Sequence, residues 1–178
     1  LSNGNLANLS DVMGEKKIIF HHGSILDNNQ LYNIINSVDI IYHLACLGVR
    51  HSLHSPIENH NVNAGGTLHV LKYAVQNNVK HFFYIASSEV YGNTLEFPIN
   101  ENSPTLPTTV YGASKLAGEY YTHAFTHRYG LNTLIIRLFN NFGPRAHYAN
   151  DAGELIPRSI VRILSDLNPI IFGDGKQT

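Results

Sequence analysis

The chain of 178 residues has the length of one ordinary domain and is long enough to bury a hydrophobic core. Hydrophobic residues make up 43% of it and charged residues 14%, which favours a packed globule over a disordered chain. Twelve basic and thirteen acidic side chains give a net charge of −1, so no basic field is available to hold a nucleic acid.

Other features argue against a membrane or secreted protein. The apolar runs are far shorter than the roughly 20 residues needed to cross a bilayer. Residues 1–5 read as a polar turn rather than a secretory leader. The single cysteine, Cys46, cannot form an internal disulfide, which suits a reducing compartment. We therefore expect a cytoplasmic protein with no nucleic-acid or membrane partner.

Short β-rich runs alternate along the chain with longer helical stretches. The predicted elements are a strand at 17–22, a helix at 28–36, a strand at 38–44, a helix from Pro56 to about Gln76, a strand at 80–86, a helix from Thr108 or Thr109 to about Arg128, a strand at 132–138, a helix at about 154–167 and a short strand at 170–172. Asp27 is a suitable cap for the first helix, and Gly130 stops the third. This alternation predicts the α/β class, with a parallel sheet wrapped by helices.

Two details refine these elements. The apolar run 40–42 suggests a strand that is buried on both faces. The Gly65–Gly66 pair costs about 2 kcal/mol of helix propensity relative to alanine, which suggests close packing at that point.

Ligands of parallel α/β sheets bind beyond the carboxyl ends of the strands. That rule directs attention to three segments, 44–46, 87–89 and 140–141, which all follow predicted strands. Tyr111 and Lys115 lie near the start of the next predicted helix, four residues apart and so on one helical face. A neighbouring ammonium lowers the pKa of a phenol, which would make Tyr111 usable as a base.

Each of these residues also has a plain structural interpretation. A Tyr-x-x-x-Lys spacing arises by chance in many chains of this composition. Ser87 and Ser88 could be turn or helix caps, and Glu89 a solvated surface charge.

Several motifs in order resemble the extended short-chain dehydrogenase/reductase family, and within it the nucleotide-sugar epimerases, dehydratases and decarboxylases. The matching segments are 38–45, 61–67, 85–92 (Ile-Ala-Ser-Ser-Glu-Val-Tyr-Gly), 111–115 (Tyr-Gly-Ala-Ser-Lys), 137–144 and 171–177. The resemblance runs from about Gly23 to the last residue. It implies a Rossmann-like doubly wound parallel sheet, incomplete at the N-terminus. Residues 1–144 would form a partial NAD-binding domain with the catalytic residues, and 145–178 the start of a substrate-binding region.

The resemblance also implies a bound NAD and transient oxidation of a nucleotide sugar, at C4 of a UDP- or dTDP-hexose. The implied catalytic residues are Ser87, Ser88, Glu89, Tyr111 and Lys115. Those implied along the cofactor are Ser24, Ile25, Leu44, Ala45, Cys46 and Ala86, together with Tyr111 and Lys115. Those implied at the substrate are Ser87, Glu89, Asn140, Glu154, Leu155, Ile156 and Pro157. A homodimer, paired through the helix after residue 56 and the Tyr111 helix, is implied in the same way.

The sequence departs from the family pattern at three places. The Gly-rich phosphate loop is not found in these residues and should precede Leu1. Ser24 stands where an acidic adenine contact is frequent, and the chain stops at Thr178, just where a diphosphate-binding arginine is expected. We therefore expect this chain to be a fragment that is inactive by itself.

The reaction within the family stays open. Many 4,6-dehydratases use neighbouring Asp and Glu after the hydroxyl residue, whereas Ser88 precedes Glu89 here. A 4-epimerase or a decarboxylase is compatible with these residues, and so is a non-catalytic module that keeps the fold. His123 and His127 could clasp a metal from one helical face, but no zinc motif accompanies them, and no metal is expected.

Overall fold

The computed structural model describes residues 4–15, 17–94, 96–149, 153–171 and 173–175. Contacts divide the chain into two compact units. One unit comprises residues 1–21 and 140–178, and the other comprises residues 22–139. The division into an NAD-binding domain at 1–144 and a substrate-binding region at 145–178 stays a prediction.

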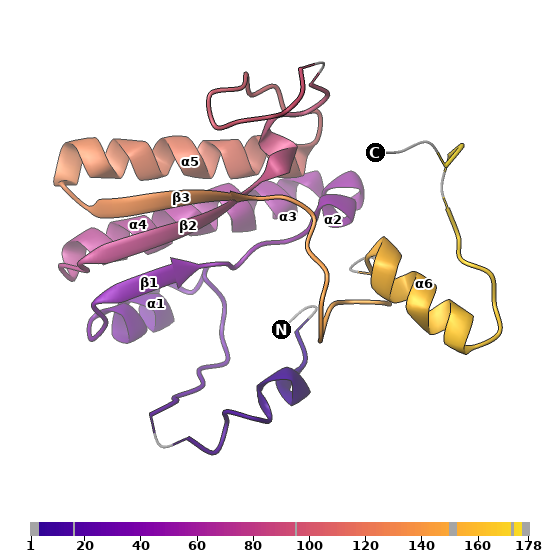
Figure 1. Cartoon of the computed structure of the whole chain (residues 1–178). Coiled ribbons are helices and arrows are strands. Elements are labelled where there is room, and N and C mark those ends of the chain that lie inside the picture. The colour runs from indigo at the N-terminus through magenta and orange to yellow at the C-terminus, as the bar shows by residue number, and fades with distance from the viewer. Residues whose placement is uncertain (1–3, 16, 95, 150–152, 172, 176–178) are drawn as a thin grey trace. The chain divides into compact units, whose positions relative to one another are not determined.

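A three-stranded parallel sheet forms the centre of the unit 22–139 (Figure 1). Its strands lie in the order β1 (Ile40–His43), β2 (His81–Ser87) and β3 (Asn132–Leu138). The helices of this unit are α1 (Asn28–Ile35), α2 (Val49–His54), α3 (Pro56–His60), η2 (Asn61–Gly65, a π-helix), α4 (Gly66–Gln76), η3 (Ser88–Val90, a 3₁₀ turn) and α5 (Val110–Tyr129). The parallel α/β architecture predicted from the sequence is confirmed.

Helix boundaries follow local capping chemistry. The Asp27 carboxylate accepts from the backbone N–H groups of Asn29 and Gln30, and so caps α1 as predicted. Thr109 caps α5, because its hydroxyl accepts from the N–H of Gly112 at 3.0 Å. Gly130 ends α5 in the left-handed conformation, with φ of 69°.

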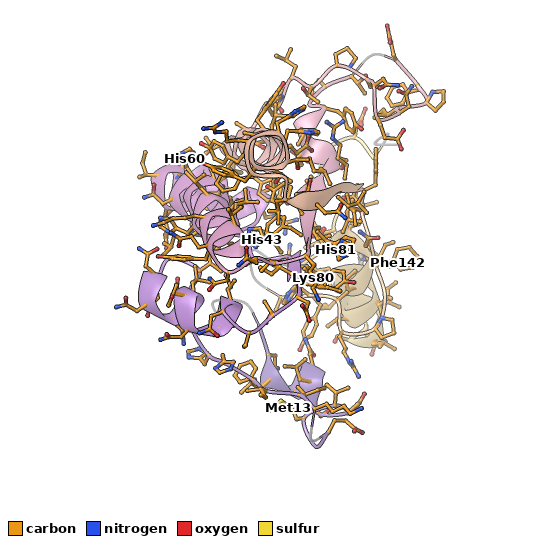
Figure 2. The ribbon with its side chains drawn as sticks, turned by 90° about the vertical axis from the view of Figure 1, so that its left-hand side faces the viewer. Met13, His43, His60, Lys80, His81 and Phe142 are labelled. Atoms are coloured by element: carbon orange, nitrogen blue, oxygen red, sulfur yellow. The ribbon has the colours of Figure 1, made fainter. Side chains whose placement is uncertain are left out.

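The core lies between the sheet and helices α1, α4 and α5, which pack on one face of it. Alternate residues of β2 point into this core, so that Phe82 and Tyr84 are fully buried. Figure 2 shows His43 among the side chains of this layer, and Lys80 at the start of β2. The core therefore holds β2 and α5 firmly against each other.

Burial of the strand run 40–42 on both faces is wrong for the described residues. Ile40 is 47% exposed and Tyr42 is 64% exposed, and the Tyr42 ring stacks on Phe83 at 4.7 Å between centroids. The helices described here cover the other face of β1, where His43 is buried.

The two outlying strand predictions are also wrong where the structure describes the chain. Residues 18–22 and 170–171 adopt no strand, and Phe172 lies outside the described residues. Ile19 is 77% exposed and Ile171 is 60% exposed. Strand propensity measures the fit to a paired, half-buried surface, and neither run has such a partner among the described residues.

The unit formed by residues 1–21 and 140–178 contains η1 (Leu6–Leu9, a 3₁₀ turn) and α6 (Leu155–Leu164). The predicted helix at 154–167 is thus confirmed with a shorter span. Within this unit the Arg145 guanidinium pairs with the Asp11 carboxylate. Among the described residues, no helix is long and apolar enough to cross a membrane.

Candidate active site

Strands β1 and β2 are parallel, so their carboxyl ends lie at the same end of the sheet. The strands pair in parallel, with His43 beside Tyr84 and Ser87 beside Leu138. The loop after β1 and the turn after β2 therefore leave the sheet on the same side, as expected for an α/β binding site.

Ser87 ends β2 with extended backbone and begins the 3₁₀ turn η3. Its Oγ accepts from the backbone N–H of Glu89 at 3.3 Å, so the capping interpretation of this serine holds. The same side chain lies close enough to the phenol of Tyr111 to lower its pKa. One hydroxyl thus caps the turn and contacts the tyrosine.

Tyr111 and Lys115 lie in the first two turns of α5. Lys115 is 3% exposed, and its ammonium donates to the carbonyl of Ile85 at 2.8 Å. The ammonium nitrogen lies 5.9 Å from the centroid of the Tyr111 ring. Helix α5 therefore carries both side chains to the end of β2, beside Ser87.

Burial dominates the acidity of this pair. Desolvation raises the pKa of Tyr111 to about 12, electrostatic interactions with Cys46 and Glu89 raise it further, and the nearby Ser87 hydroxyl lowers it. Burial also lowers the pKa of the Lys115 ammonium. The expectation that Lys115 makes Tyr111 a ready base is thus not met in the protein alone.

Cys46 lies closer to Tyr111 and Lys115 than the sequence indicated. Its side chain lies close enough to Tyr111 and Lys115 to raise the pKa of both, and the residue is exposed. Sequence spacing carries no signal for this contact, because the loop after β1 alone determines where the thiol lies.

The other residues predicted along the cofactor are spread over the unit 22–139. Ala86 is 3% exposed within β2, whereas Leu44 and Ala45 are exposed directly after β1. The Ser24 hydroxyl accepts from the N–H of Leu26 at 3.2 Å in a surface turn. Ile25 packs against the core, where a Cβ on Gly66 would overlap it. The close packing predicted for the glycine pair therefore applies to Gly66.

The residues predicted at the substrate belong to the other unit, apart from Ser87 and Glu89. Asn140 is exposed, and Glu154 precedes α6 at its capping position. Leu155 and Ile156 are exposed in the first turn of that helix, and Pro157 is half-buried. Their placement around a substrate stays a prediction.

Sequence reasoning missed a pair of buried amides that hold the loop after β1. Asn63 accepts from the Leu47 N–H at 2.7 Å and donates to the Leu47 carbonyl at 2.9 Å. Asn59 donates to the same carbonyl and to that of Gly48, each at 3.1 Å. The spacing of four residues between the two asparagines is the sequence signal that indicates this pair.

The predicted absence of a metal rests on the sequence. Within the described ranges, no group of three or more potential ligands could hold a metal ion. His123 and His127 are both exposed on α5.

The fold is that of a Rossmann-like α/β protein, and Ser87, Tyr111 and Lys115 lie together at the carboxyl end of β2. A family model described as the NAD dependent epimerase/dehydratase family matches residues 2–178. The chain therefore belongs to the NAD-dependent epimerase/dehydratase family, and the predicted resemblance is confirmed.

Relatives of this chain include both 4-epimerases and 4,6-dehydratases of nucleotide sugars. A UDP-glucose 4-epimerase of Halalkalibacterium halodurans is 34% identical over 100% of this chain and 54% of its own length. The solved UDP-N-acetylglucosamine 4-epimerase of Methanobrevibacter ruminantium has a TM-score of 0.94 and 32% identity over 99% of this chain and 57% of its own. A dTDP-glucose 4,6-dehydratase of Streptomyces venezuelae, solved with NAD, has a TM-score of 0.90 and 32% identity over 97% of this chain and 52% of its own. The chain thus spans about half the length of these relatives.

Proposed function

We propose that this chain carries the catalytic residues of an NAD-dependent enzyme that oxidises a nucleotide sugar transiently at C4. The observation that supports this most is the contact of the Tyr111 phenol with Ser87, next to the buried ammonium of Lys115. Family membership and relatives that act on nucleotide sugars point to the same chemistry. A UDP- or dTDP-hexose is the proposed substrate class.

Three side chains have distinct roles in the proposal. Tyr111 takes the proton of the sugar C4 hydroxyl and later returns it. Ser87 donates a hydrogen bond to the same sugar oxygen and so holds it near the phenol. Lys115 holds positive charge beside Tyr111, and its position is fixed by the Ile85 carbonyl.

The strand-end residues fit the nicotinamide end of NAD. Leu44 and Ala45 present exposed apolar surface next to the site, and the Lys115 ammonium has three donors, of which the Ile85 carbonyl takes one. When bound, NAD would supply the hydride acceptor that oxidation at C4 requires. Ser24 and Ile25 are the proposed adenine-side contacts. The Gly-rich loop that usually binds the pyrophosphate is not part of the 178 residues.

Glu89 decides between the two leading reactions. It lies in η3, half-buried, and its charge acts on Tyr111. In a 4,6-dehydratase it would transfer a proton during loss of water, with Ser88 beside it. In a 4-epimerase it would be a bystander. A decarboxylase is the third possibility, because a relative of that name is also similar.

The remaining parts of the proposal concern binding and assembly. Asn140 and residues 154–157 would contact the nucleotide diphosphate and its base. A homodimer through α3 and α5 is supported by exposed apolar side chains on these adjacent helices, Ile57 at 74% and Tyr120 at 64%. We propose a cytoplasmic location on the basis of the single free cysteine.

Product mass tests the proposal directly. The full-length protein is incubated with NAD and a panel of UDP-, dTDP- and GDP-sugars. A product lighter by one water identifies a 4,6-dehydratase, an isomer of unchanged mass a 4-epimerase, and loss of carbon dioxide a decarboxylase. No conversion of any sugar would contradict the proposal. The inactivity expected of the 178-residue chain alone is checked in the same assay.

Replacing Glu89 with Gln separates the two leading reactions. We expect the variant to lose dehydratase activity, because the amide cannot transfer the proton. An epimerase would be spared. Full dehydratase activity in Glu89→Gln would remove this carboxylate from the mechanism.

A further inference from the structure

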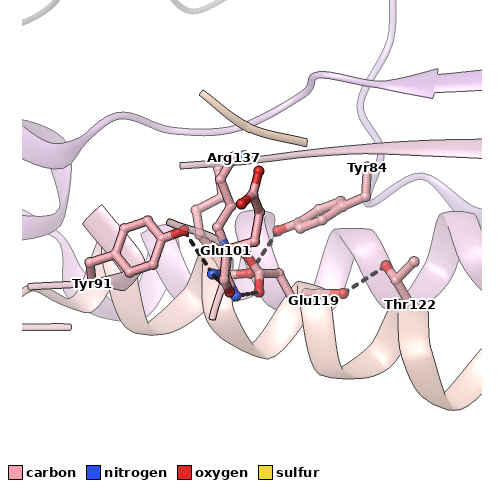
Figure 3. A network of polar contacts seen from close by, with 8 residues as sticks. Tyr84, Tyr91, Glu101, Glu119, Thr122 and Arg137 are labelled. Carbon is pink, nitrogen blue, oxygen red and sulfur yellow. Dashed lines mark hydrogen bonds and ion pairs between the residues drawn. The ribbon is translucent and has the colours of Figure 1, made fainter. Parts of the chain in front are cut away.

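One guanidinium joins three segments of the unit 22–139. The Nε of Arg137 donates to one carboxylate oxygen of Glu119 at 2.8 Å, and its Nη2 donates to the other at 2.7 Å (Figure 3). Its Nη1 donates to the Tyr91 hydroxyl at 2.9 Å and to the Glu101 carbonyl at 3.2 Å. Arg137 therefore makes four hydrogen bonds to a helix, a turn and a loop.

Glu119 is the buried member of this arrangement, and Arg137 is half-buried. The Glu119 side chain is 5% exposed and the Arg137 side chain 20% exposed. Two parallel charge-assisted hydrogen bonds fix both the distance and the orientation of the two groups. The pair also raises the pKa of the guanidinium, through the hydrogen bonds from Glu119. A buried, two-pronged contact of this kind holds its partners more precisely than a surface ion pair.

The partners of Arg137 are connected to the candidate active site. Glu119 lies on α5 one turn beyond Lys115, which itself lies one turn beyond Tyr111, so the three share one face. On the sheet, Arg137 pairs in register with Ala86, the residue before Ser87.

Tyr91 links Arg137 to the turn η3 that follows Ser87. It is 4% exposed and directly follows η3, and its N–H donates to the Ser88 carbonyl at 3.0 Å. The turn also packs tightly on the start of α5, since a Cβ on Gly112 would lie 2.6 Å from the Glu89 carbonyl oxygen. A change in how Tyr91 is held therefore moves the turn that follows Ser87.

From these contacts we infer that Arg137 is a positioning residue for the proposed reaction. Through Glu119 and Tyr91 it sets the distance between the Ser87 hydroxyl and the Tyr111 phenol. It touches neither of them, so it acts through geometry alone. This inference rests on the proposed function, because it assigns a purpose to the alignment of that same site.

Removing Arg137 alone would leave the Glu119 carboxylate buried without its ion-pair partner, which is strongly destabilising, so that loss of activity could not be told from unfolding. The test therefore uses the paired replacement Glu119→Met/Arg137→Met in the full-length protein. Apolar pairs of similar volume often replace buried ion pairs without loss of stability. A second variant, Arg137→Lys, keeps the charge but lacks the planar fork. The matched control is Lys80→Met, which removes an ion pair of 2.9 Å whose lysine is 69% exposed.

Two readouts are taken for each variant. Hydrogen exchange of the amides at 88–92 measures whether the turn is still held, whatever the activity. Steady-state kinetics on the best nucleotide sugar measures the consequence for catalysis. We expect faster exchange confined to this turn and a fall in kcat of about 10- to 100-fold with little change in KM, because small misplacements of reacting groups are costly. The control should match the wild type in both.

Each outcome is decisive. Unchanged exchange at 88–92 in the folded variants would overturn the inference, because the turn would be held without Arg137. Faster exchange with unchanged kcat would overturn it too, because the alignment would not matter. A wild-type protein that converts none of the sugars would instead contradict the proposed function. In that case the exchange data would still show whether Arg137 holds the turn.

Discussion

Burial sets the chemistry of single residues in this site more than sequence neighbours do. Tyr111 and Lys115 are one helical turn apart, yet desolvation raises the pKa of the phenol to about 12. The phenol is therefore protonated at neutral pH in the protein without cofactor or substrate. A bound ligand that brings positive charge would shift this balance towards the phenolate.

His43 is a buried residue with a clear pH dependence. It is 4% exposed, and its Nε2 is hydrogen-bonded to the Thr67 hydroxyl at 2.8 Å. Burial, helped by the charge of Lys115, lowers its pKa from 6.5 to about 4. The folded protein thus holds fewer protons than the unfolded chain between these two values.

We expect the free energy of unfolding to decrease as pH falls from 6.5 towards 4, because the neutral imidazole favours the folded state. The loss attributable to His43 is on the order of 3 kcal/mol once pH is below 4. Urea unfolding of the wild type and of His43→Gln, compared at pH 7 and pH 4.5, measures it. His127→Gln is the control, since His127 is exposed. An equal pH dependence in wild type and His43→Gln would contradict the assignment.

Single residues could be predicted where the motif itself determines them. The contact between Ser87 and Tyr111 follows from one residue at a strand end and another at the next helix start. Cys46 and Arg137 depend on how two loops and a strand meet in three dimensions. The spacing of residues along the chain does not predict such long-range contacts.

At the scale of elements, capping residues predicted helix ends correctly, whereas strand propensity also predicted two strands that the structure lacks in the described residues. Asp27, Thr109 and Gly130 each fix a helix end through local hydrogen bonds or backbone conformation, so the sequence predicts them. The apolar runs at 17–22 and 170–172 lack a neighbouring strand within the described residues, and propensity alone cannot supply one. The predicted helix from Pro56 to Gln76 is interrupted by the π-helix η2, which no periodicity showed.

The π-helix carries the amide that holds the loop after β1. Replacing Asn63 with Ala would leave the buried N–H of Leu47 without its hydrogen-bond acceptor. We expect a loss of about 1–3 kcal/mol in the free energy of unfolding. Urea unfolding checks this, with Asn61→Ala as the control, because Asn61 is exposed in the same element. Equal stability of the two variants would mean that the amide contact contributes little.

Helix α5 and the turn after Ser87 pack without space between them. A methyl group on Gly112 would approach the Glu89 carbonyl oxygen to 2.6 Å, and backbone there cannot yield easily. Gly112→Ala should therefore cost about 1–3 kcal/mol in stability. Gly65→Ala is the matched control, since no atom lies within 4 Å of its added Cβ. It should be neutral or stabilising by up to about 1 kcal/mol. Thermal unfolding distinguishes the two, and a Gly112→Ala variant as stable as Gly65→Ala would contradict the packing argument.

At the scale of the whole molecule, the order of the strands carries the site. The parallel pairing of β1, β2 and β3 brings segments far apart in sequence to one edge. The alternation of runs in the sequence was sufficient to predict this architecture, because helices α4 and α5, which connect the three strands, pack on the same face of the sheet. The residues beyond Phe139 belong to the other unit, and the sequence alone gives their roles only by resemblance.

The central claim is that Tyr111 transfers the proton in the reaction of the full-length enzyme. The direct measurement is kcat of Tyr111→Phe on the nucleotide sugar that the wild type converts, with NAD present. Tyr129→Phe is the matched control, since Tyr129 lies at the far end of the same helix and is 56% exposed. We predict that Tyr111→Phe lowers kcat by about 10²- to 10⁴-fold while Tyr129→Phe retains it. A folded Tyr111→Phe variant with wild-type turnover would contradict the account.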